Sequence, residues 1–361
     1  MPQTATLLSV QILRALAAAM VMIGHAAYEA ETIAGKLGQA PPQLRFVDWA
    51  FGVDVFFVIS GFIMLHTSDG FGGLAGPKRF LMRRLIRVVP LYWLMTSALL
   101  IGAFAVPGML NTPVDGWRMA LASYLFIPFA TQAGDVHPVL GLGWTLNYEM
   151  FFYAFFALSM LAPLRWAAAA MACSFTVFVW AGMHFQFGSV QLRFWTNPII
   201  LEFLFGAGLG LALKAGLRLG AFAAPALALA GCLGAVALGP AFGLAQDLPP
   251  LLRNGVPAAM IVAGAVLGPA LPASRFVLVL AALGDASYSL YLTHPFSIRP
   301  LRNLWLGLAG PQFPLVIYLL AACAAAVTGA LLVYHCVERP MTLALQRRFR
   351  PENEQFPRRQ G

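Results

Sequence analysis

Charged residues are scarce in this sequence. Asp, Glu, Lys and Arg together make up 10% of its 361 residues, whereas hydrophobic residues make up 60%. Because soluble domains carry about 25% charged residues, this shortage excludes a soluble globular protein. Runs of about 20 apolar residues are long enough to cross a bilayer, so the composition predicts an all-α integral membrane protein with many spans.

Cysteine is also rare. Its four residues, Cys173, Cys232, Cys323 and Cys336, are scattered among apolar runs, without a CxxC pair or a spacing typical of metal ligands. We interpret them as small residues of the core or of the lipid-facing surface. The sequence therefore indicates no metal site.

The N-terminus lacks the basic segment that precedes the apolar core of a signal peptide. Its first basic residue, Arg14, lies inside the first apolar run, which we interpret as a retained span. The net charge of +9 does not indicate a nucleic-acid partner, because the basic residues stand between apolar runs or in the C-terminal tail, as membrane topology requires. We expect a multi-pass protein of the inner (plasma) membrane, in contact with membrane lipid.

Ten apolar runs predict the spans. They cover about residues 7–28, 47–67, 88–107, 140–162, 166–185, 197–214, 219–243, 251–271, 276–297 and 312–336. The segment 117–130 is shorter and carries Arg118, so we interpret it as an interfacial or re-entrant piece of a long loop. Gly206 and Gly210 form a GxxxG motif in the sixth run, which indicates close helix packing.

The basic residues orient these spans. The densest cluster between spans follows the second run, and the tail is also basic, so the positive-inside rule places both on the cytoplasmic side. That cluster holds Lys78, Arg79, Arg83, Arg84 and Arg87, whereas the predicted outer loops hold Glu29, Glu31, Asp115, Asp135 and Asp247 with fewer basic residues, among them Arg299 and Arg302. We predict a polytopic bundle of about ten transmembrane helices with both termini cytoplasmic. Residues 1–340 form the transmembrane domain, and 341–361 form a polar, disordered tail.

An arginine and a histidine interrupt the first run, in the sequence RALAAAMVMIGH. Arg14 and His25 are eleven positions apart, almost three helical turns, so their side chains point to one face, ~16 Å apart along the axis. Ionisable groups at membrane depth cost ~2.5–3.5 kcal/mol each, so a chain that keeps several usually uses them. The shared face predicts one site inside the bundle. A snorkelling arginine and a packed histidine are the structural alternatives.

Three further groups of polar residues stand in or beside apolar runs. Asp54 is alone in WAFGVDVFFVISGFIMLH, where it can orient a histidine, pair with an arginine or form a purely structural pair. Arg83, Arg84 and Arg87 fit a phosphate clamp, although topology and anionic lipid account for them slightly better on the bare sequence. The third group lies in GWTLNYEMFFY and SYSLYLTH: Trp144, Asn147, Tyr148, Glu149, Tyr153, Tyr288, Ser289, Tyr291 and His294. Glu149 and Tyr153 share a helix face, which indicates a lined cavity.

Six motifs occur in a fixed order along almost the whole chain. They are Arg14-x10-His25, GVDVFFVISGF at 52–62, RRLIR at 83–87, GWTLNYEMFFY at 143–153, SYSLYLTH at 287–294, and ERP at 338–340, which we interpret as a helix stop. In this order they resemble the membrane acyltransferase 3 family, which includes exopolysaccharide and lipopolysaccharide O-acetyltransferases. One departure is HPF after the ninth-run motif, where relatives often have a residue between His and Pro.

The resemblance implies ten helices, cytoplasmic acetyl-CoA as the usual donor, and an acceptor presented on the outer side. We expect this acceptor to be a polysaccharide or a lipid-linked saccharide, and we expect no metal. The resemblance assigns function to the positions of Arg14, His25, Arg84 and Arg87. The hypothesis that follows has Arg83, Arg84 and Arg87 hold the phosphates of acyl-CoA. His25 then acts as general base or as acyl carrier. Asp54 or Glu149 orients His25, and we expect Trp144, Tyr153, Tyr291 and His294 to bind substrate.

Two other classes of function stay open on the sequence. A transporter or flippase would also keep buried Arg, Asp, Glu and His residues, but the sequence has no inverted repeat and no evident pair of broken helices. A structural membrane subunit would tolerate alanine at Arg14, His25 and Arg84.

Overall fold

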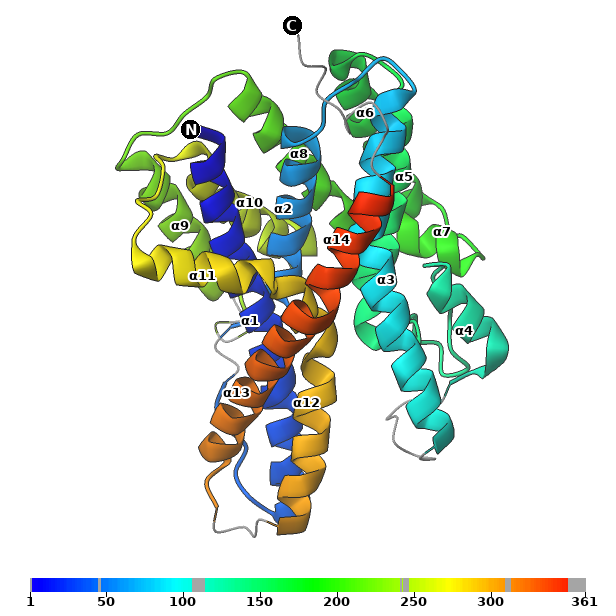
Figure 1. The fold of residues 1–361 in the computed structure, drawn as a ribbon, viewed down its shortest axis with the longest axis vertical. Helices are drawn as coiled ribbons and strands as arrows, with labels where there is room; N and C mark the ends of the chain where they lie inside the picture. Colours follow the sequence, from blue (N-terminus) through cyan, green and yellow to red (C-terminus); the bar gives the residue numbers. More distant parts are fainter. Residues whose placement is uncertain are drawn as a thin grey trace, which may run out of the picture. The chain divides into compact units, whose positions relative to one another are not determined.

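The computed structural model describes residues 2–44, 47–105, 114–240, 242, 247–308 and 313–349, and side chains from residue 8 onward. Within these ranges the chain is helical, and β structure is limited to one isolated bridge between Ala130 and Val136. The prediction of an all-α protein is therefore confirmed (Figure 1).

The helices form two compact units. The first unit, from the N-terminus to Ser68 and over Met171–Leu331, holds α1 (Pro2–Leu37), α2 (Phe51–His66), most of α6 (Leu164–His184), α7 (Val190–Trp195), α8 (Leu201–Lys214), α9 (Ala223–Ala237), α10 (Val256–Leu267), α11 (Arg275–Asp285), α12 (Ser287–Leu308) and most of α13 (Leu315–Val333). The second unit, Asp69–Ala170 and the chain from Leu332, holds α3 (Ala75–Ala105), α4 (Gly116–Tyr124), α5 (Trp144–Ser159) and α14 (Arg339–Arg348).

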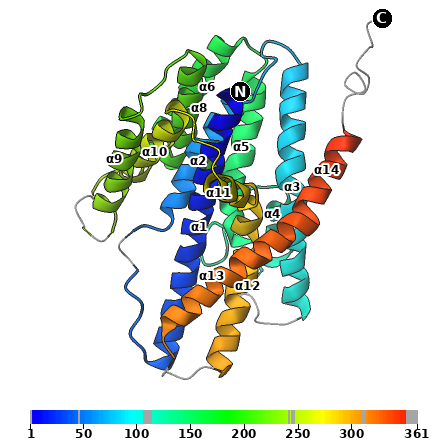
Figure 2. The same ribbon diagram turned by 60° about the vertical axis from the view of Figure 1, so that its left-hand side comes forward.

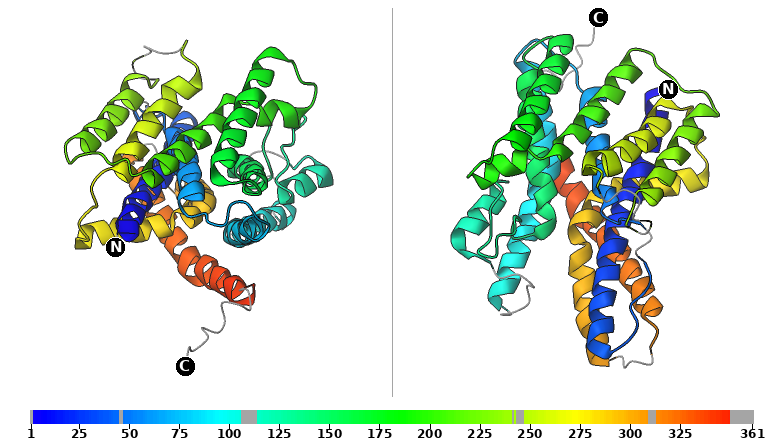
Figure 3. Two further views of the ribbon diagram at one scale, coloured as in Figure 1. Left: turned by 90° about the horizontal axis from the view of Figure 1, so that it is seen from above. Right: turned by 180° about the vertical axis from the view of Figure 1, so that it is seen from behind.

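The first unit is built around α1. The N-terminal half of α1 packs against α2 and α10, where Val10 and Ala17 join a buried apolar core. Its C-terminal half packs against α12 and shares a second core with α12 and α13, in which Ala26 and Ala30 are fully buried (Figure 1; Figure 3, right). Because alanine side chains are small, the neighbouring helices approach α1 closely over the segment that follows His25.

Glycines set the close packing of α2 on α8. A Cβ on Gly206 would collide with the backbone of α2 at Val58 and Phe62, and a Cβ on Gly61 would collide with the carbonyl of Phe203 in α8. The close helix approach that the GxxxG motif indicated is therefore confirmed. It brings Asp54 of α2 and Glu202 of α8 into one buried layer.

The second unit is organised by α3. α5 packs along α3, and the rings of Phe80 and Phe156 lie 4.8 Å apart between their centroids (Figure 2). α4 joins α3 further along, where the indole Nε1 of Trp93 donates to the Tyr124 carbonyl at 2.9 Å. With nine residues α4 is too short to cross a bilayer core of about 30 Å, in agreement with the interfacial or re-entrant piece predicted at 117–130.

Three predicted boundaries differ from the structure. The predicted third span begins at about 88, whereas α3 begins at Ala75, so the arginine cluster lies in the helical segment that precedes the predicted span. The ninth run is broken after Asp285, where α11 and α12 are bent by 66°, so the chain does contain a broken helix. The ERP motif at 338–340 does not stop the last helix, which continues from Leu315 through a π-helical turn to Arg348. The rest of the predicted tail, 350–361, lies outside the described residues.

Four helices are long and apolar enough to cross a membrane. They are Leu8–Leu37, Ala75–Ala105, Leu164–His184 and the continuous Leu315–Arg348, with α11 and α12 as a fifth if the bent pair is one span. Three shorter helices, Phe51–His66, Ala223–Ala237 and Leu251–Leu267, are also apolar. These helices support a membrane protein, while the count of ten spans and the orientation of the termini stay predictions.

Candidate active site

Two histidines meet within the first unit. His25 comes from α1 and His294 from α12, and their ring centroids are 4.9 Å apart with the planes tilted by 54°. The Nδ1 atom of each ring bonds the backbone carbonyl four residues earlier, at Val21 for His25 and at Leu290 for His294, both at 2.9 Å. The structure thus brings together a predicted catalytic residue and a predicted substrate-binding residue.

These backbone bonds assign the tautomers of both rings. A carbonyl oxygen only accepts, so Nδ1 carries the hydrogen in each ring and Nε2 of the neutral imidazole keeps its lone pair. His294 is fully buried, and its Nε2 has no hydrogen-bond partner within the described residues. His25 is partly exposed. The pair therefore offers two nitrogens with lone pairs, one on a fully buried ring and the other on a partly exposed ring.

The residues on either side of His294 affect the hydrogen bonding and the packing of α12 at this point. Pro295 lies inside the helix and has no N–H, so it cannot donate to the carbonyl of Tyr291 one turn earlier. Tyr291 is buried, and its ring meets Phe56 of α2 edge-on at 5.9 Å between centroids. Tyr291 thus packs against α2, and its role in binding substrate stays a prediction.

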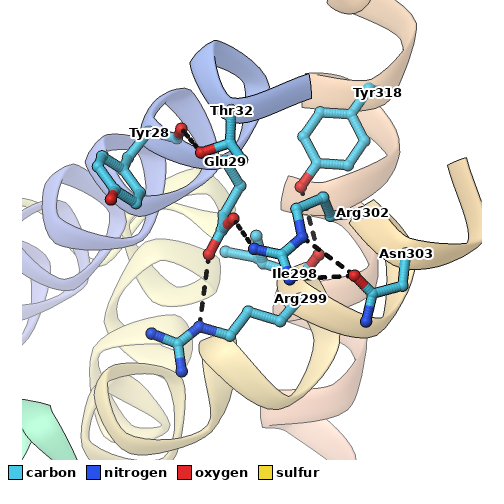
Figure 4. A network of polar contacts seen from close by, with 8 residues as sticks. All are labelled: Tyr28, Glu29, Thr32, Ile298, Arg299, Arg302, Asn303 and Tyr318. Atoms are coloured by element: carbon cyan, nitrogen blue, oxygen red, sulfur yellow. Dashed lines mark hydrogen bonds and ion pairs between the residues drawn. The ribbon is translucent and has the colours of Figure 1, made fainter. Parts of the chain in front are cut away.

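An ion network follows the histidine pair along α1 and α12. Glu29 lies one turn beyond His25, is 3% exposed, and contacts two arginines of α12 (Figure 4). The Nη1 atom of Arg302 donates to Glu29 Oε2 at 2.5 Å, and the Nε atom of Arg299 is 3.4 Å from Oε1. The prediction ended both spans before these residues and placed them in outer loops; the structure places them inside α1 and α12, where they pair, while their outer position stays a prediction. The i to i+4 spacing of His25 and Glu29 was a signal in the sequence that could have identified Glu29 as part of this site.

Arg14 takes part in a different network. It is 7% exposed, and its Nη1 atom donates to Gln11 Oε1 at 3.0 Å; the amide nitrogen of Gln11 in turn contacts Asp285 at the end of α11. Because Arg14 and His25 are about 16 Å apart along α1, Arg14 lies away from the histidine pair. The separation is the one expected from the sequence, and a role for Arg14 and His25 in one site stays a prediction.

Asp54 is paired with a second carboxyl group. It is 7% exposed and hydrogen-bonds Glu202, which is 1% exposed, while Arg253 of the π-helical turn Leu251–Gly255 acts on it electrostatically. A hydrogen bond between two carboxyl groups requires a proton on one of them. The carbonyl of Val21 bonds Nδ1 of His25, so the proposed orienting role of Asp54 would have to act elsewhere on the ring and stays a prediction. Sequence reasoning did not single out Glu202.

The second unit holds the arginine cluster and the predicted residues of α5. The hydroxyl of Tyr153 donates to Glu149 Oε2 at 2.6 Å, which confirms that these residues share a face. The guanidinium carbon of Arg84 lies 5.7 Å from the ring centroid of Phe80 and 6.0 Å from that of Tyr153, as in cation–π contacts. Arg84 is thereby fixed against α5.

The other predicted residues of this unit differ in exposure. Arg83 is exposed, whereas Arg87 is partly buried and acts electrostatically on both Arg84 and Tyr153. Trp144 is the first residue of α5 and meets Tyr148 edge-on at 5.9 Å between ring centroids. Three arginines beside one glutamate leave a net positive charge, which suits a polyanion such as the phosphates of acyl-CoA.

No cluster of three or more His, Cys, Asp or Glu side chains that would hold a metal ion occurs in the described part of the chain. Apolar helices long enough to cross a membrane, a histidine pair in the first unit and a cationic cluster in the second unit are features that suit a membrane protein with group-transfer chemistry. The chain belongs to the acyltransferase 3 family, whose acyltransferase domain matches residues 7–335.

A curated relative supports this assignment. The exopolysaccharide production protein ExoZ of Rhizobium meliloti (strain 1021) is 37% identical over 303 residues, which are 82% of this chain and 90% of that protein. No solved structure matches the chain significantly. The family favours an enzyme over a transporter, and the described residues contain one broken span, between α11 and α12, where a pair of broken helices would be expected of a transporter.

Proposed function

We propose that this protein is an O-acyltransferase of the inner membrane. It moves an acetyl or another short acyl group from cytoplasmic acyl-CoA to a hydroxyl of an extracytoplasmic or lipid-linked polysaccharide. The family supports acyl transfer. The similarity to an exopolysaccharide production protein supports a polysaccharide acceptor. The observation that carries the proposal is the histidine pair, with both Nδ1 atoms held by backbone carbonyls.

His25 acts as the general base in this proposal. Its Nε2 takes the proton of the acceptor hydroxyl while the oxygen attacks the thioester carbonyl. The tetrahedral intermediate expels CoA as a thiolate, which recovers the proton from His25, so the products are an ester and free CoA. In the covalent alternative His25 Nε2 attacks the thioester first, the C–S bond breaks and CoA leaves as a thiolate. The acceptor hydroxyl then takes the acyl group from the acyl-imidazole, and its proton ends on CoA, so the products are again an ester and free CoA.

His294 acts as a positioning residue. Two neutral rings that both present lone pairs at Nε2 cannot hydrogen-bond each other through these atoms. When His25 becomes protonated, a neighbouring basic nitrogen is a partner for the new charge. The full burial of His294 supports this role, because a buried ring with fixed Nδ1 keeps its orientation.

The arginines of α3 bind the donor. Guanidinium groups bind phosphate oxygens in a bidentate manner, and acyl-CoA carries several phosphates. The contacts of Arg84 with Phe80 and Tyr153 support a preorganised binder, and Arg87 adds charge beside it. No metal is needed for this reaction.

The test uses purified protein in detergent with radiolabelled acetyl-CoA and saccharide extracted from the source cells. We expect His25→Ala to lower CoA release and saccharide labelling roughly 10²- to 10⁴-fold, the usual contribution of an acid–base residue. His184→Ala is the matched control, because His184 also bonds the carbonyl four residues earlier through Nδ1, at 2.8 Å, but is exposed on α6. Unchanged CoA release in His25→Ala would overturn the role of His25. Label that stays on the denatured protein without acceptor distinguishes the acyl carrier from the base.

A further inference from the structure

Glu29 is a buried carboxylate with two cationic partners. Its side chain is 4% exposed and contacts Arg299 and Arg302, which lie one helical turn apart on α12 (Figure 4). One carboxylate neutralises one guanidinium, so the network keeps a net positive charge beside the histidine pair. A charge near the protein interior costs free energy unless it is paired, so we expect the second guanidinium to serve either the structure or the binding of a ligand.

The two arginines differ in exposure and in how many of their guanidinium nitrogens are bonded. The side chain of Arg302 is 12% exposed, and its Nε and Nη2 atoms donate to Asn303 Oδ1 at 3.1 and 3.0 Å while Nη1 holds Glu29. Arg302 is thus engaged on each of its three nitrogens. Arg299 is 40% exposed and contacts Glu29 through Nε, and its terminal nitrogens have no hydrogen bond or ion pair with any described residue. Figure 4 shows these two nitrogens directed away from Glu29.

Arg299 lies near the histidine pair that we propose for the reaction. It lies five residues after His294 on α12, and it acts electrostatically on both His25 and His294. Along α1 the order is Arg14, His25 and Glu29, so Glu29 and its arginines lie beyond His25 as seen from Arg14. In the predicted orientation this is the outer side, from which the acceptor arrives.

We propose that Arg299 binds an oxyanion of the acceptor and thereby selects anionic saccharides. The ligand is a carboxylate of the polysaccharide or a phosphate of its lipid carrier, held by the outward fork of the guanidinium. Glu29 fixes the fork through Nε, and Arg302 keeps Glu29 paired while the oxyanion is absent. This inference rests on the proposed function and names the substrate class of that site.

The test compares acceptors that differ only in charge. The full chain is purified in a zwitterionic detergent and assayed with saturating acetyl-CoA. The acceptors are the deacylated polysaccharide of the source cells, the same polysaccharide after chemical reduction of its carboxylates to hydroxyls, and the extracted lipid-linked saccharide. We expect Arg299→Gln to raise KM roughly ten- to a hundredfold for one of the two anionic acceptors, the polysaccharide with its carboxylates or the lipid-linked saccharide. This is the range for a lost hydrogen bond to a charged group, and kcat should stay within about twofold of the wild-type value. Arg299→Lys should restore part of the affinity.

Controls separate binding from folding. Arg275→Gln makes the same chemical change at an exposed position of α11 and should leave both constants unchanged. Arg299→Gln should remain folded because Arg302 still pairs with Glu29, and monodisperse elution with an unchanged KM for acetyl-CoA checks this.

Each outcome decides the inference. An effect limited to the polysaccharide with carboxylates, or to the lipid-linked saccharide, supports the proposal and identifies the source of the oxyanion. A fall in kcat with neutral and anionic acceptors alike would mean that Arg299 stabilises the transition state and would overturn it. An effect that requires anionic lipid vesicles would also overturn it, and so would a wild-type enzyme that prefers the reduced polysaccharide. If the wild-type protein releases no CoA with any acceptor, the proposed function itself fails.

Discussion

The imidazoles of His25 and His294 lie 4.9 Å apart between ring centroids, and each is held by the carbonyl one turn earlier on its own helix. The two rings thus share the same tautomer and present the same atom, Nε2, to their surroundings. One ring is fully buried and the other is partly exposed. This asymmetry is what gives them different roles in the proposed reaction.

The first prediction concerns His294. We expect His294→Ala to lower kcat roughly ten- to a hundredfold, because the protonated His25 loses a neighbouring partner, a loss comparable to one hydrogen bond to a charged group. KM for acetyl-CoA should be unchanged, and His294→Gln should recover part of kcat because its amide oxygen accepts a hydrogen bond. Steady-state CoA release measures both constants. A loss in His25→Ala/His294→Ala equal to the product of the single losses would contradict the pairing.

The sequence predicts much of this fold because each apolar run contains helix, although the ninth run is broken after Asp285. It also locates His25 and Arg14, since a charge in an apolar run is visible without any structure. The meeting of His25 with His294 is not predictable in this way, because it depends on how α12 packs on α1 after the break near Asp285. Tertiary packing, not local pattern, decides which distant residues touch.

Charged residues at the ends of the apolar runs explain why the predicted limits of the spans differ from the limits of the helices. Glu29 and Arg302 lower the apolar character of the sequence, and the prediction ended the spans before them. In the structure they neutralise each other inside the helices, so their cost is reduced and both helices continue. The arginines of α3 were placed between two spans for the same reason, and the structure has them on a helix, where the guanidinium of Arg84 packs on the rings of Phe80 and Tyr153.

The second prediction concerns Arg84. Arg84→Gln should raise KM for acetyl-CoA about tenfold or more, since a charged contact with phosphate is lost, while kcat changes little. The effect should shrink when the donor is acetyl-dephospho-CoA, if Arg84 binds the 3′-phosphate. Arg79→Gln is the control, because Arg79 is exposed on the same helix. A fall in kcat at unchanged KM would show that Arg84 does not act through donor binding.

The third prediction concerns the carboxyl pair of Asp54 and Glu202. The amide of Glu202→Gln can donate the hydrogen bond that the shared proton provides, so we expect a free energy of unfolding within about 1 kcal/mol of the wild type. Glu202→Ala leaves Asp54 buried without this partner and should destabilise the protein by about 2 kcal/mol or more. Thermal melting in one detergent measures both. Equal melting temperatures for the two variants would mean that the pair contributes no hydrogen bond.

The last prediction separates packing from helix propensity on α8. Gly206→Ala places a Cβ against the backbone of Val58 and Phe62, and overpacking of this kind costs about 1–3 kcal/mol. Gly208 lies two residues further on the same helix with nothing within 4 Å of an added Cβ. Gly208→Ala should therefore be neutral or stabilising by about 0.5–1 kcal/mol, because alanine is the better helix former. Melting temperatures that shift in the same direction would contradict the close contact between α2 and α8, and with it the buried layer that holds Asp54 and Glu202.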